Sequence, residues 1–155
     1  MTTEMRENVY MNCLGSDKVE IGYTTGVFDL FHIGHLNILR KAKEQCDYLV
    51  VGVTVDELVA YKGKKAFIPY EERAAIVEAI KYVDKVVPQS SMDKMKAWDK
   101  IQFNKIFVGD DWKGTDIWNK WENEFSKVGV EIVYFPYTTQ TSSTKLRNAL
   151  MQNNR

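Results

Sequence analysis

The sequence lacks the features of a membrane, disulfide-rich or nucleic-acid-binding protein. No apolar run in its 155 residues approaches the roughly 18 residues needed to span a bilayer, and the first residues contain no signal-peptide h-region. The two cysteines, Cys13 and Cys46, lack CxxC spacing, which indicates reduced thiols rather than a disulfide framework. Lys plus Arg and Asp plus Glu both number 21, so no overall field attracts nucleic acid or membranes. We therefore expect a cytoplasmic protein without nucleic-acid or membrane partners.

The common motifs of nucleophilic catalysis are also missing. The chain has no GxSxG elbow, no cysteine beside a histidine and no P-loop signature. Transfer between phosphates does not need them, because a phosphate monoester, with a second pKa of about 6, is already a nucleophilic oxyanion near pH 7. Catalysis would then consist of positioning and charge stabilisation.

The two histidines of the chain, His32 and His35, fall in one segment, residues 26–35. Alternation of apolar and polar residues over 19–25 predicts a strand before it, and a helical pattern follows. Residues three apart share a helix face, so both rings should lie side by side at the helix N-terminus, which favours phosphate. A metal site or simple helix capping is the alternative, but no third histidine, cysteine or carboxylate cluster completes a metal shell.

Strand-like and helix-like segments alternate along the chain, which predicts one α/β domain: a Rossmann-like, doubly wound, five-stranded parallel sheet flanked by helices. The strand-like segments are residues 19–25, 48–53, 85–87, 105–108 and 130–135. The helix-like segments are residues 34–45, 74–80, 92–101, 117–128 and a last one from about Ser143. We expect a polar loop after the second strand and an end to the third strand at Pro88. The domain should span residues 19–155, after an N-terminal extension of residues 1–18.

Four polar segments follow predicted strands: residues 26–35, 54–65, 109–114 and 136–144. Parallel sheets bind ligands at the carboxyl ends of their strands, so these segments should meet.

Each of these segments also has a plainer interpretation. A lysine-rich loop with Lys62, Lys64 and Lys65 is usually solvated, but beside the histidines it could clamp a polyphosphate. The hydroxyl-rich run 138–144 could cap a helix or bind phosphate oxygens. Asp29, Asp110 and Asp111 could bind ribose hydroxyls, ammonium groups or a divalent metal.

Residues 26–35, Gly-Val-Phe-Asp-Leu-Phe-His-Ile-Gly-His, resemble the signature of the nucleotidyltransferase superfamily that carries a His-x-Gly-His motif. Further segments resemble the bacterial glycerol-3-phosphate cytidylyltransferases within it, over about residues 20 to 150: residues 47–51, 56–57, 70–73, 82–84 and 109–112. The resemblance implies an enzyme that joins CTP and a small phosphorylated alcohol, best glycerol 3-phosphate, into a CDP-alcohol and pyrophosphate. It also implies Mg²⁺ bound with CTP, a homodimer and a role in supplying cell-envelope polymers.

The resemblance implies residue roles as well. His32 and His35 would stabilise the α-phosphorus, with Lys62 as a third catalytic residue. Lys62, Lys64 and Arg73 would bind the phosphorylated alcohol, and no metal ligand is assigned. The implied nucleotide-binding residues are Val27, Phe28, Asp29, Gly34, Lys81, Gly109, Asp110, Asp111, Tyr137, Thr138, Thr141, Ser142, Ser143 and Thr144.

Three departures from the family pattern leave the acceptor open. Tyr137 and Lys81 stand where the family has arginines, and Val27 stands where it has threonine. The alternatives are an adenylyltransferase of the same fold that acts on a sugar phosphate, a choline- or ethanolamine-phosphate cytidylyltransferase, and a non-catalytic nucleotide-binding module. The presence of both histidines and Lys62 disfavours the last, because a pure sensor need not stabilise a transition state.

Overall fold

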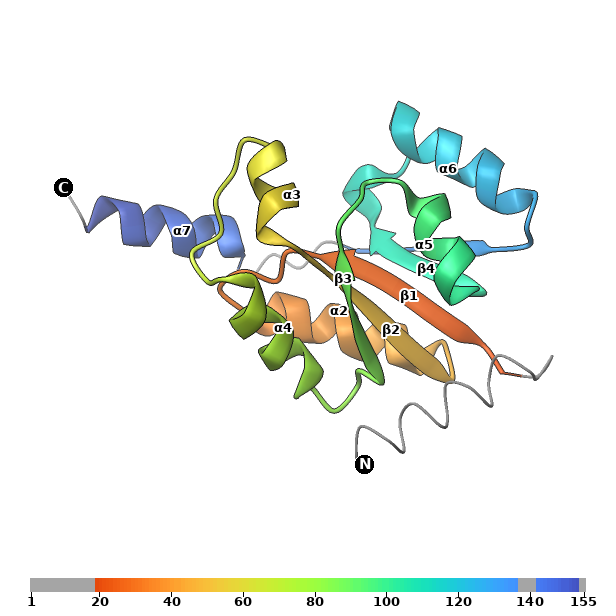
Figure 1. Ribbon diagram of the computed structural model, residues 1–155, viewed down its shortest axis with the longest axis horizontal. Helices are drawn as coiled ribbons and strands as arrows, with labels where there is room; N and C mark the ends of the chain where they lie inside the picture. The colour runs from red at the N-terminus through yellow and green to blue at the C-terminus, as the bar shows by residue number, and fades with distance from the viewer. Residues whose placement is uncertain (1–18, 137–141, 154–155) are drawn as a thin grey trace.

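A five-stranded parallel sheet forms the centre of the computed structural model, which describes residues 19–136 and 142–153 (Figure 1). The strands are β1 (Ile21–Gly26), β2 (Tyr48–Thr54), β3 (Lys85–Gln89), β4 (Lys105–Gly109) and β5 (Glu131–Phe135), in the order β3-β2-β1-β4-β5. All four neighbouring pairs are parallel. The predicted α/β fold with a five-stranded parallel sheet is therefore confirmed.

The strand order places the reversal of chain direction across the sheet between β1 and β4. From β1 the chain moves outward to β2 and β3, and then crosses back to β4 and β5. In such sheets the crevice at the carboxyl ends of the two strands beside the reversal is the usual ligand site. The histidine segment directly follows β1, and so begins at this crevice.

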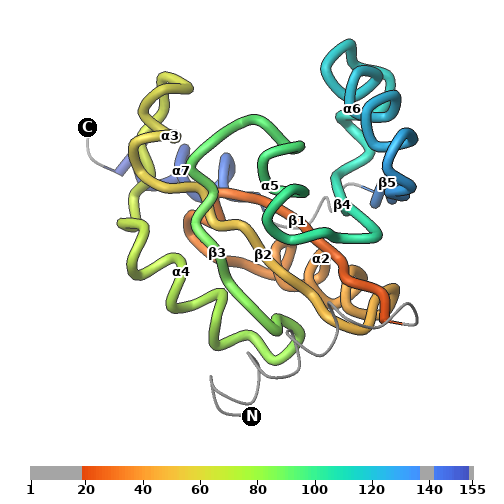
Figure 2. The backbone as a smooth tube through the Cα atoms, turned by 45° about the vertical axis from the view of Figure 1, so that its right-hand side comes forward, coloured from red at the N-terminus to blue at the C-terminus, as the bar shows by residue number. Residues whose placement is uncertain are grey.

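Helices cover both faces of the sheet (Figure 2). They are α2 (Ile33–Glu44), α3 (Asp56–Tyr61), α4 (Tyr70–Glu78), α5 (Lys94–Ile101), α6 (Asp116–Ser126) and α7 (Ser143–Gln152). Leu39 of α2 and Val77 of α4 share a buried cluster with Val51 of β2, whereas Trp121 of α6 lies in a second cluster with the neighbouring Val50. Because successive strand residues face opposite sides, β2 is buried throughout, which explains its continuous apolar sequence.

Two predictions about the fold are wrong in detail. The segment after β2, predicted to be a polar loop, contains the short helix α3, whose Leu58 and Val59 are buried. β3 continues through Pro88 to Gln89 instead of ending at the proline. β3 lies at the edge of the sheet with β2 as its neighbour, and an edge strand tolerates the missing N–H of proline.

The chain ends in α7, which extends away from the sheet beside α3 and α4 (Figure 1). No residue of α7 is fully buried, and Leu150 and Met151 are exposed. Within residues 19–136 and 142–153, no helix has the length and apolar character that crossing a membrane would require. The predicted extension, residues 1–18, lies outside the described residues, so the domain boundary at residue 19 stays a prediction.

Candidate active site

A tight turn after β1 brings the histidines to the carboxyl edge of the sheet. Phe28 and Leu30 adopt positive φ values of 53° and 49°, a region that residues with a side chain rarely occupy. A Cβ at Gly26 would lie 3.0 Å from the Phe28 ring, so the glycine permits the close packing of this turn. Strained residues of this kind occur most often at ligand sites, where surrounding contacts hold them.

The two histidine rings lie side by side at the start of α2, as their spacing predicts. His32 is the N-cap, and its Nδ1 accepts a hydrogen bond from the Gly34 N–H at 2.9 Å. The His32 N–H in turn donates to Nδ1 of His35 at 3.3 Å, and the ring centroids are 4.0 Å apart. Because both Nδ1 atoms accept hydrogen bonds, each neutral ring carries its hydrogen on Nε2.

Both Nε2 atoms face the hydroxyl of Ser143, which comes from the far end of the sequence. The Oγ of Ser143 lies 3.3 Å from Nε2 of His32 and 3.4 Å from Nε2 of His35, and it donates to the Asp29 carbonyl. Ser143 is the first residue of α7, and Ser142 caps this helix by accepting from the Lys145 N–H. The N-termini of α2 and α7 therefore meet at the imidazoles, which favours an anion.

The surroundings keep both imidazoles neutral at pH 7. Burial lowers the pKa of His32 below its usual value. Burial and the neighbouring His32 lower the pKa of His35 to about 4, although the Asp29 carboxylate acts in the opposite direction. The rings thus present two Nε2–H donors to a ligand without carrying a net charge.

Asp29 connects three segments of the site. Its buried carboxylate accepts hydrogen bonds from the Phe67 N–H at 2.9 Å and the Ile68 N–H at 3.0 Å. It also pairs with the Arg147 guanidinium of α7 at 3.1 Å, and this guanidinium lies over the Phe67 ring. The carboxylate predicted to bind nucleotide therefore joins the β1–α2 turn to α7 and to the loop before α4.

Arg73, predicted to bind substrate, is 1 % exposed and lies behind the site. Its guanidinium donates to the carbonyls of Val27, Thr54 and Ile68 and pairs with Asp56 at 2.7 Å. These bonds join the ends of β1 and β2 to α3 and to the loop before α4. They account for the burial of the arginine without a substrate, so they support a structural role instead.

Lysines approach the same edge of the sheet from two elements. Lys62 ends α3, and partial burial together with the charge of Lys64 lowers its pKa. Lys94, at the start of α5, donates from Nζ to Oγ1 of Thr25 at 2.8 Å. Burial, reinforced by Lys62, lowers the pKa of Lys94 to about 8. Lys94 lies in no motif and was therefore not predicted from the sequence; the available signal was its position in the segment that follows β3.

The remaining predicted residues occupy three different positions. Gly109, Asp110 and Asp111 lie at the end of β4, where a short 3₁₀ helix spans Asp110–Trp112; a Cβ at Gly109 would lie 2.6 Å from a carboxylate oxygen of Asp111. Phe28 is buried in the turn after β1, and Gly34 is buried in the first turn of α2, whereas Thr144 is exposed in the first turn of α7.

Lys81 stands apart from the other predicted residues. It precedes β3, which places it at the amino edge of the sheet, opposite the histidines. Tyr137, Thr138 and Thr141 lie outside the described residues.

Comparisons with known proteins identify the family of the chain. A model of the cytidylyltransferase-like family matches residues 23–149. Glycerol-3-phosphate cytidylyltransferase of Bacillus subtilis (strain 168) is 42% identical over 129 residues, which cover 82% of this chain and 94% of that protein. The Staphylococcus aureus (strain NCTC 8325 / PS 47) protein of the same name is 36% identical over 128 residues, 82% of this chain and 92% of that one.

A solved structure shares the fold. The lipopolysaccharide core biosynthesis protein from Thermoplasma volcanium GSS1 has a TM-score of 0.67 and 26% identity, covering 79% of this chain and 99% of that chain. The resemblance first noted in the histidine segment thus extends over most of the chain. By its sequence and by its fold, this protein belongs to the cytidylyltransferase-like family.

Proposed function

We propose that the protein transfers a cytidylyl group from CTP to the phosphate of a small phosphorylated alcohol, with glycerol 3-phosphate as the acceptor. The observation that carries this proposal is the meeting of two imidazole Nε2 atoms with the Ser143 hydroxyl where α2 and α7 begin. Membership of the family supports the reaction class. The two relatives named glycerol-3-phosphate cytidylyltransferase support the choice of acceptor.

The proposed reaction exchanges one phosphoanhydride bond for another. An oxygen of the acceptor phosphate forms a bond to the α-phosphorus of CTP, while the bond from that phosphorus to the oxygen bridging to the β-phosphate breaks. Pyrophosphate leaves with the electron pair of the broken bond. Because the acceptor phosphate has a second pKa of about 6, it is already a dianion near pH 7, and no protein base has to activate it.

In this mechanism the histidines act as neutral hydrogen-bond donors. Their Nε2–H groups donate to the non-bridging oxygens of the α-phosphate, which would replace the Ser143 hydroxyl as their partner. Negative charge on these oxygens reorganises in the transition state, and donors fixed in advance stabilise it without further rearrangement. The hydrogen bonds at Nδ1 supply this fixation.

The charged groups around the histidines divide between the two substrates. The N-terminus of α7, with Ser142, Ser143 and Thr144, would bind the β- and γ-phosphates, so the Ser143 hydroxyl would exchange the imidazoles for a phosphate oxygen. Lys62 and Lys94 would bind the acceptor phosphate, since they approach from the α3 and α5 side of the crevice. The charge of Lys62 lowers the pKa of Lys94, and the charge of Lys64 lowers the pKa of Lys62. A bound dianion would relieve that repulsion between ammonium groups.

We also propose that Mg²⁺ arrives with CTP. Within residues 19–136 and 142–153, no group of three or more His, Cys, Asp or Glu residues could hold a metal ion. The Asp29 carboxylate is already engaged by three donors. Mg²⁺ is commonly held largely by substrate phosphates, and here the triphosphate would supply most of its ligands; the ion would neutralise charge on the departing pyrophosphate. We further infer a homodimer in the cytoplasm, where CTP is available.

A substrate panel tests the proposal. CTP and ATP would each be incubated with Mg²⁺ and glycerol 3-phosphate, phosphocholine, phosphoethanolamine or a sugar phosphate, with pyrophosphate and the nucleotide product measured. We expect CDP-glycerol from CTP and glycerol 3-phosphate, and none from the His32→Ala, His35→Ala double variant. Product formed with ATP but not with CTP would contradict the proposal. So would a preference of the CTP reaction for phosphoethanolamine over glycerol 3-phosphate.

A further inference from the structure

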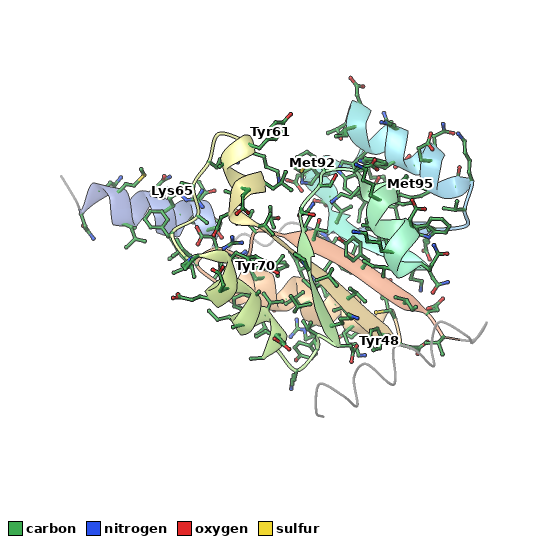
Figure 3. All side chains as sticks on the ribbon, viewed as in Figure 1. Tyr48, Tyr61, Lys65, Tyr70, Met92 and Met95 are labelled. Atoms are coloured by element: carbon green, nitrogen blue, oxygen red, sulfur yellow. The ribbon has the colours of Figure 1, made fainter. Side chains whose placement is uncertain are left out.

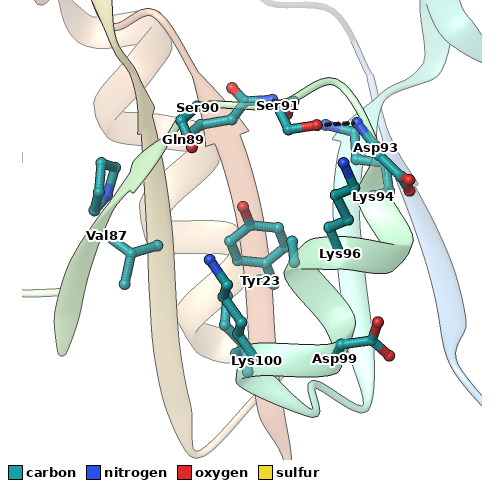
Figure 4. Close-up of a pocket in the computed structure, with 13 residues that line it drawn as sticks. Tyr23, Val87, Gln89, Ser90, Ser91, Asp93, Lys94, Lys96, Asp99 and Lys100 are labelled. Atoms are coloured by element: carbon teal, nitrogen blue, oxygen red, sulfur yellow. Dashed lines mark hydrogen bonds between the residues drawn. The ribbon is translucent and has the colours of Figure 1, made fainter.

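A cavity of about 670 Å³ lies between the edge strand β3 and α5, on the face of the sheet opposite α2 (Figure 4). Its principal lining residues are Tyr23, Val87, Gln89, Lys94, Lys100 and Ile101. The floor is an aromatic ring and aliphatic side chains. The charged lining residues are Lys94, Lys96 and Lys100, with Asp93 and Asp99. Because lysines outnumber aspartates, the cavity suits a small molecule that carries negative charge and a few polar groups.

The Tyr23 hydroxyl is the most unusual group in this cavity. Tyr23 is 2 % exposed, and its ring stacks on Phe103 with centroids 4.9 Å apart. The hydroxyl is directed into the cavity (Figure 4), and among residues 19–136 and 142–153 it has no hydrogen-bond partner. A Cβ at Gly52 would lie 2.6 Å from it, so the glycine leaves room for this hydroxyl. Burial raises the pKa of Tyr23, which keeps the hydroxyl protonated and able to donate.

The cavity is continuous with the proposed acceptor site through Lys94. Tyr23 and Thr25 alternate with Thr24 along β1 and so share one face of the sheet. Nζ of Lys94 is hydrogen-bonded to Oγ1 of Thr25, and Lys94 also lines the cavity. A ligand whose phosphate is held at Lys94 would therefore extend along β1 toward the Tyr23 hydroxyl.

We propose that the Tyr23 hydroxyl determines acceptor specificity by hydrogen-bonding a hydroxyl group of the phosphorylated polyol. This inference rests on the proposed function for the position of the acceptor phosphate. The Tyr23 hydroxyl opens onto the cavity, so a ligand hydroxyl seated there would supply the hydrogen-bond partner that the described residues do not. Acceptors with a quaternary or primary ammonium group would be disfavoured, because the ammonium group of Lys100 also faces this end of the cavity (Figure 4).

Steady-state kinetics of Tyr23→Phe test the inference with two acceptors. Glycerol 3-phosphate carries two hydroxyls, and propyl phosphate has the same carbon chain without them. For Tyr23→Phe we expect KM for glycerol 3-phosphate to rise about tenfold, the ratio that corresponds to about 1.4 kcal/mol, with kcat and KM for CTP unchanged. KM for propyl phosphate should be the same in both proteins. Tyr134→Phe, which removes a hydroxyl bonded to Glu122 on the surface, is the matched control and should change neither value.

Two further measurements separate the possible failures. Calorimetry would compare the binding of glycerol 3-phosphate to the wild type and to Tyr23→Phe, and thermal melts would show that both are equally folded, since this hydroxyl has no partner to lose. If the wild type forms CDP-glycerol but both proteins bind glycerol 3-phosphate equally, the inference is wrong and the proposed function stands. If the wild type forms no CDP-alcohol and binds no polyol phosphate, both are wrong. If Tyr23→Phe differs from the wild type in sedimentation coefficient but not in KM for glycerol 3-phosphate, the cavity is an interface between subunits. That result would also overturn the inference.

Discussion

The backbone N–H of His32 donates a hydrogen bond to Nδ1 of His35, so the first histidine fixes the ring of the second. The sequence spacing of three makes this possible, because His32 is the N-cap of α2 and His35 is its third helical residue. With the His32 ring held by the Gly34 N–H, both Nδ1 atoms are occupied as acceptors. Each Nε2–H group is then directed at the position that the Ser143 hydroxyl takes.

Acidification should destabilise the protein through His35. Burial lowers its pKa in the folded protein from 6.5 to about 4. Between these values the unfolded chain binds a proton at His35 that the folded protein does not, so the free energy of unfolding falls as the pH drops through this window. Thermal melts from about pH 7 to about pH 4.5 should show a smaller loss for His35→Gln. A difference between the two proteins that stays constant over this range would contradict the lowered pKa.

Lys94 should give the reaction an alkaline limb. Its pKa of about 8 means that the free enzyme loses this positive charge above that pH. If Lys94 binds the acceptor phosphate, kcat/KM for the acceptor should fall as the pH rises past about 8, because this ratio reports the free enzyme. Lys94→Arg keeps its charge and should flatten the profile, although a larger side chain in a buried site lowers the maximum. The same alkaline limb in Lys94→Arg would assign the titration to another group.

Loss of the Arg147 guanidinium should loosen the attachment of α7. The Asp29 side chain is 1% exposed, and without Arg147 its charge would be buried with two backbone donors alone. We expect Arg147→Ala to lower the free energy of unfolding by about 1–2 kcal/mol, and to raise KM for CTP because Ser143 would no longer be held against the histidines.

Arg147→Lys should recover part of both effects, whereas Asn148→Ala, an exposed change on the same helix, should have neither. Chemical denaturation and steady-state kinetics provide the two measurements. Normal KM for CTP in a clearly destabilised Arg147→Ala variant would separate α7 from nucleotide binding.

The Ser143 hydroxyl should matter for nucleotide binding more than for stability. It donates to the Asp29 carbonyl and lies beside both imidazoles. We expect Ser143→Ala to raise KM for CTP about five- to tenfold, in line with one or two neutral hydrogen bonds. Ser143→Thr keeps the hydroxyl and should stay within about twofold of the wild type. Equal loss in both variants would indicate a steric effect instead.

The sequence predicts the fold well because its signals are local. β2 is a continuous apolar run, and the stripe of Trp121 and Phe125 does lie on one buried face of α6. α3 was missed because a helix of six residues shows less than two turns of periodicity. Pro88 was misread because whether a strand lies at the edge of the sheet depends on the order of all five strands.

The site is less predictable from sequence because its parts interact over long separations. Asp29 and Arg147 are 118 residues apart, and Arg73 reaches Val27 across 46 residues. No local pattern distinguishes an arginine that joins strand ends from one that binds a substrate. Figure 3 shows a similar contrast: Tyr61 projects from α3 and is 84% exposed, although Val59 of the same short helix is buried. The histidine pair was predictable because both rings and both of their backbone donors lie within four residues.

The central claim is that His32 and His35 act through their Nε2–H groups, and paired substitutions at His35 test it most directly. Glutamine places an amide N–H donor near the position of Nε2, whereas asparagine places its amide oxygen near Nδ1 and preserves the bond from the His32 N–H. We predict that kcat falls by about a hundredfold or more in His35→Asn and by clearly less in His35→Gln, with both variants folded as judged by circular dichroism. The measurement is single-turnover formation of CDP-glycerol from CTP and glycerol 3-phosphate. A His35→Asn variant as active as the wild type, or more active than His35→Gln, would contradict the claim.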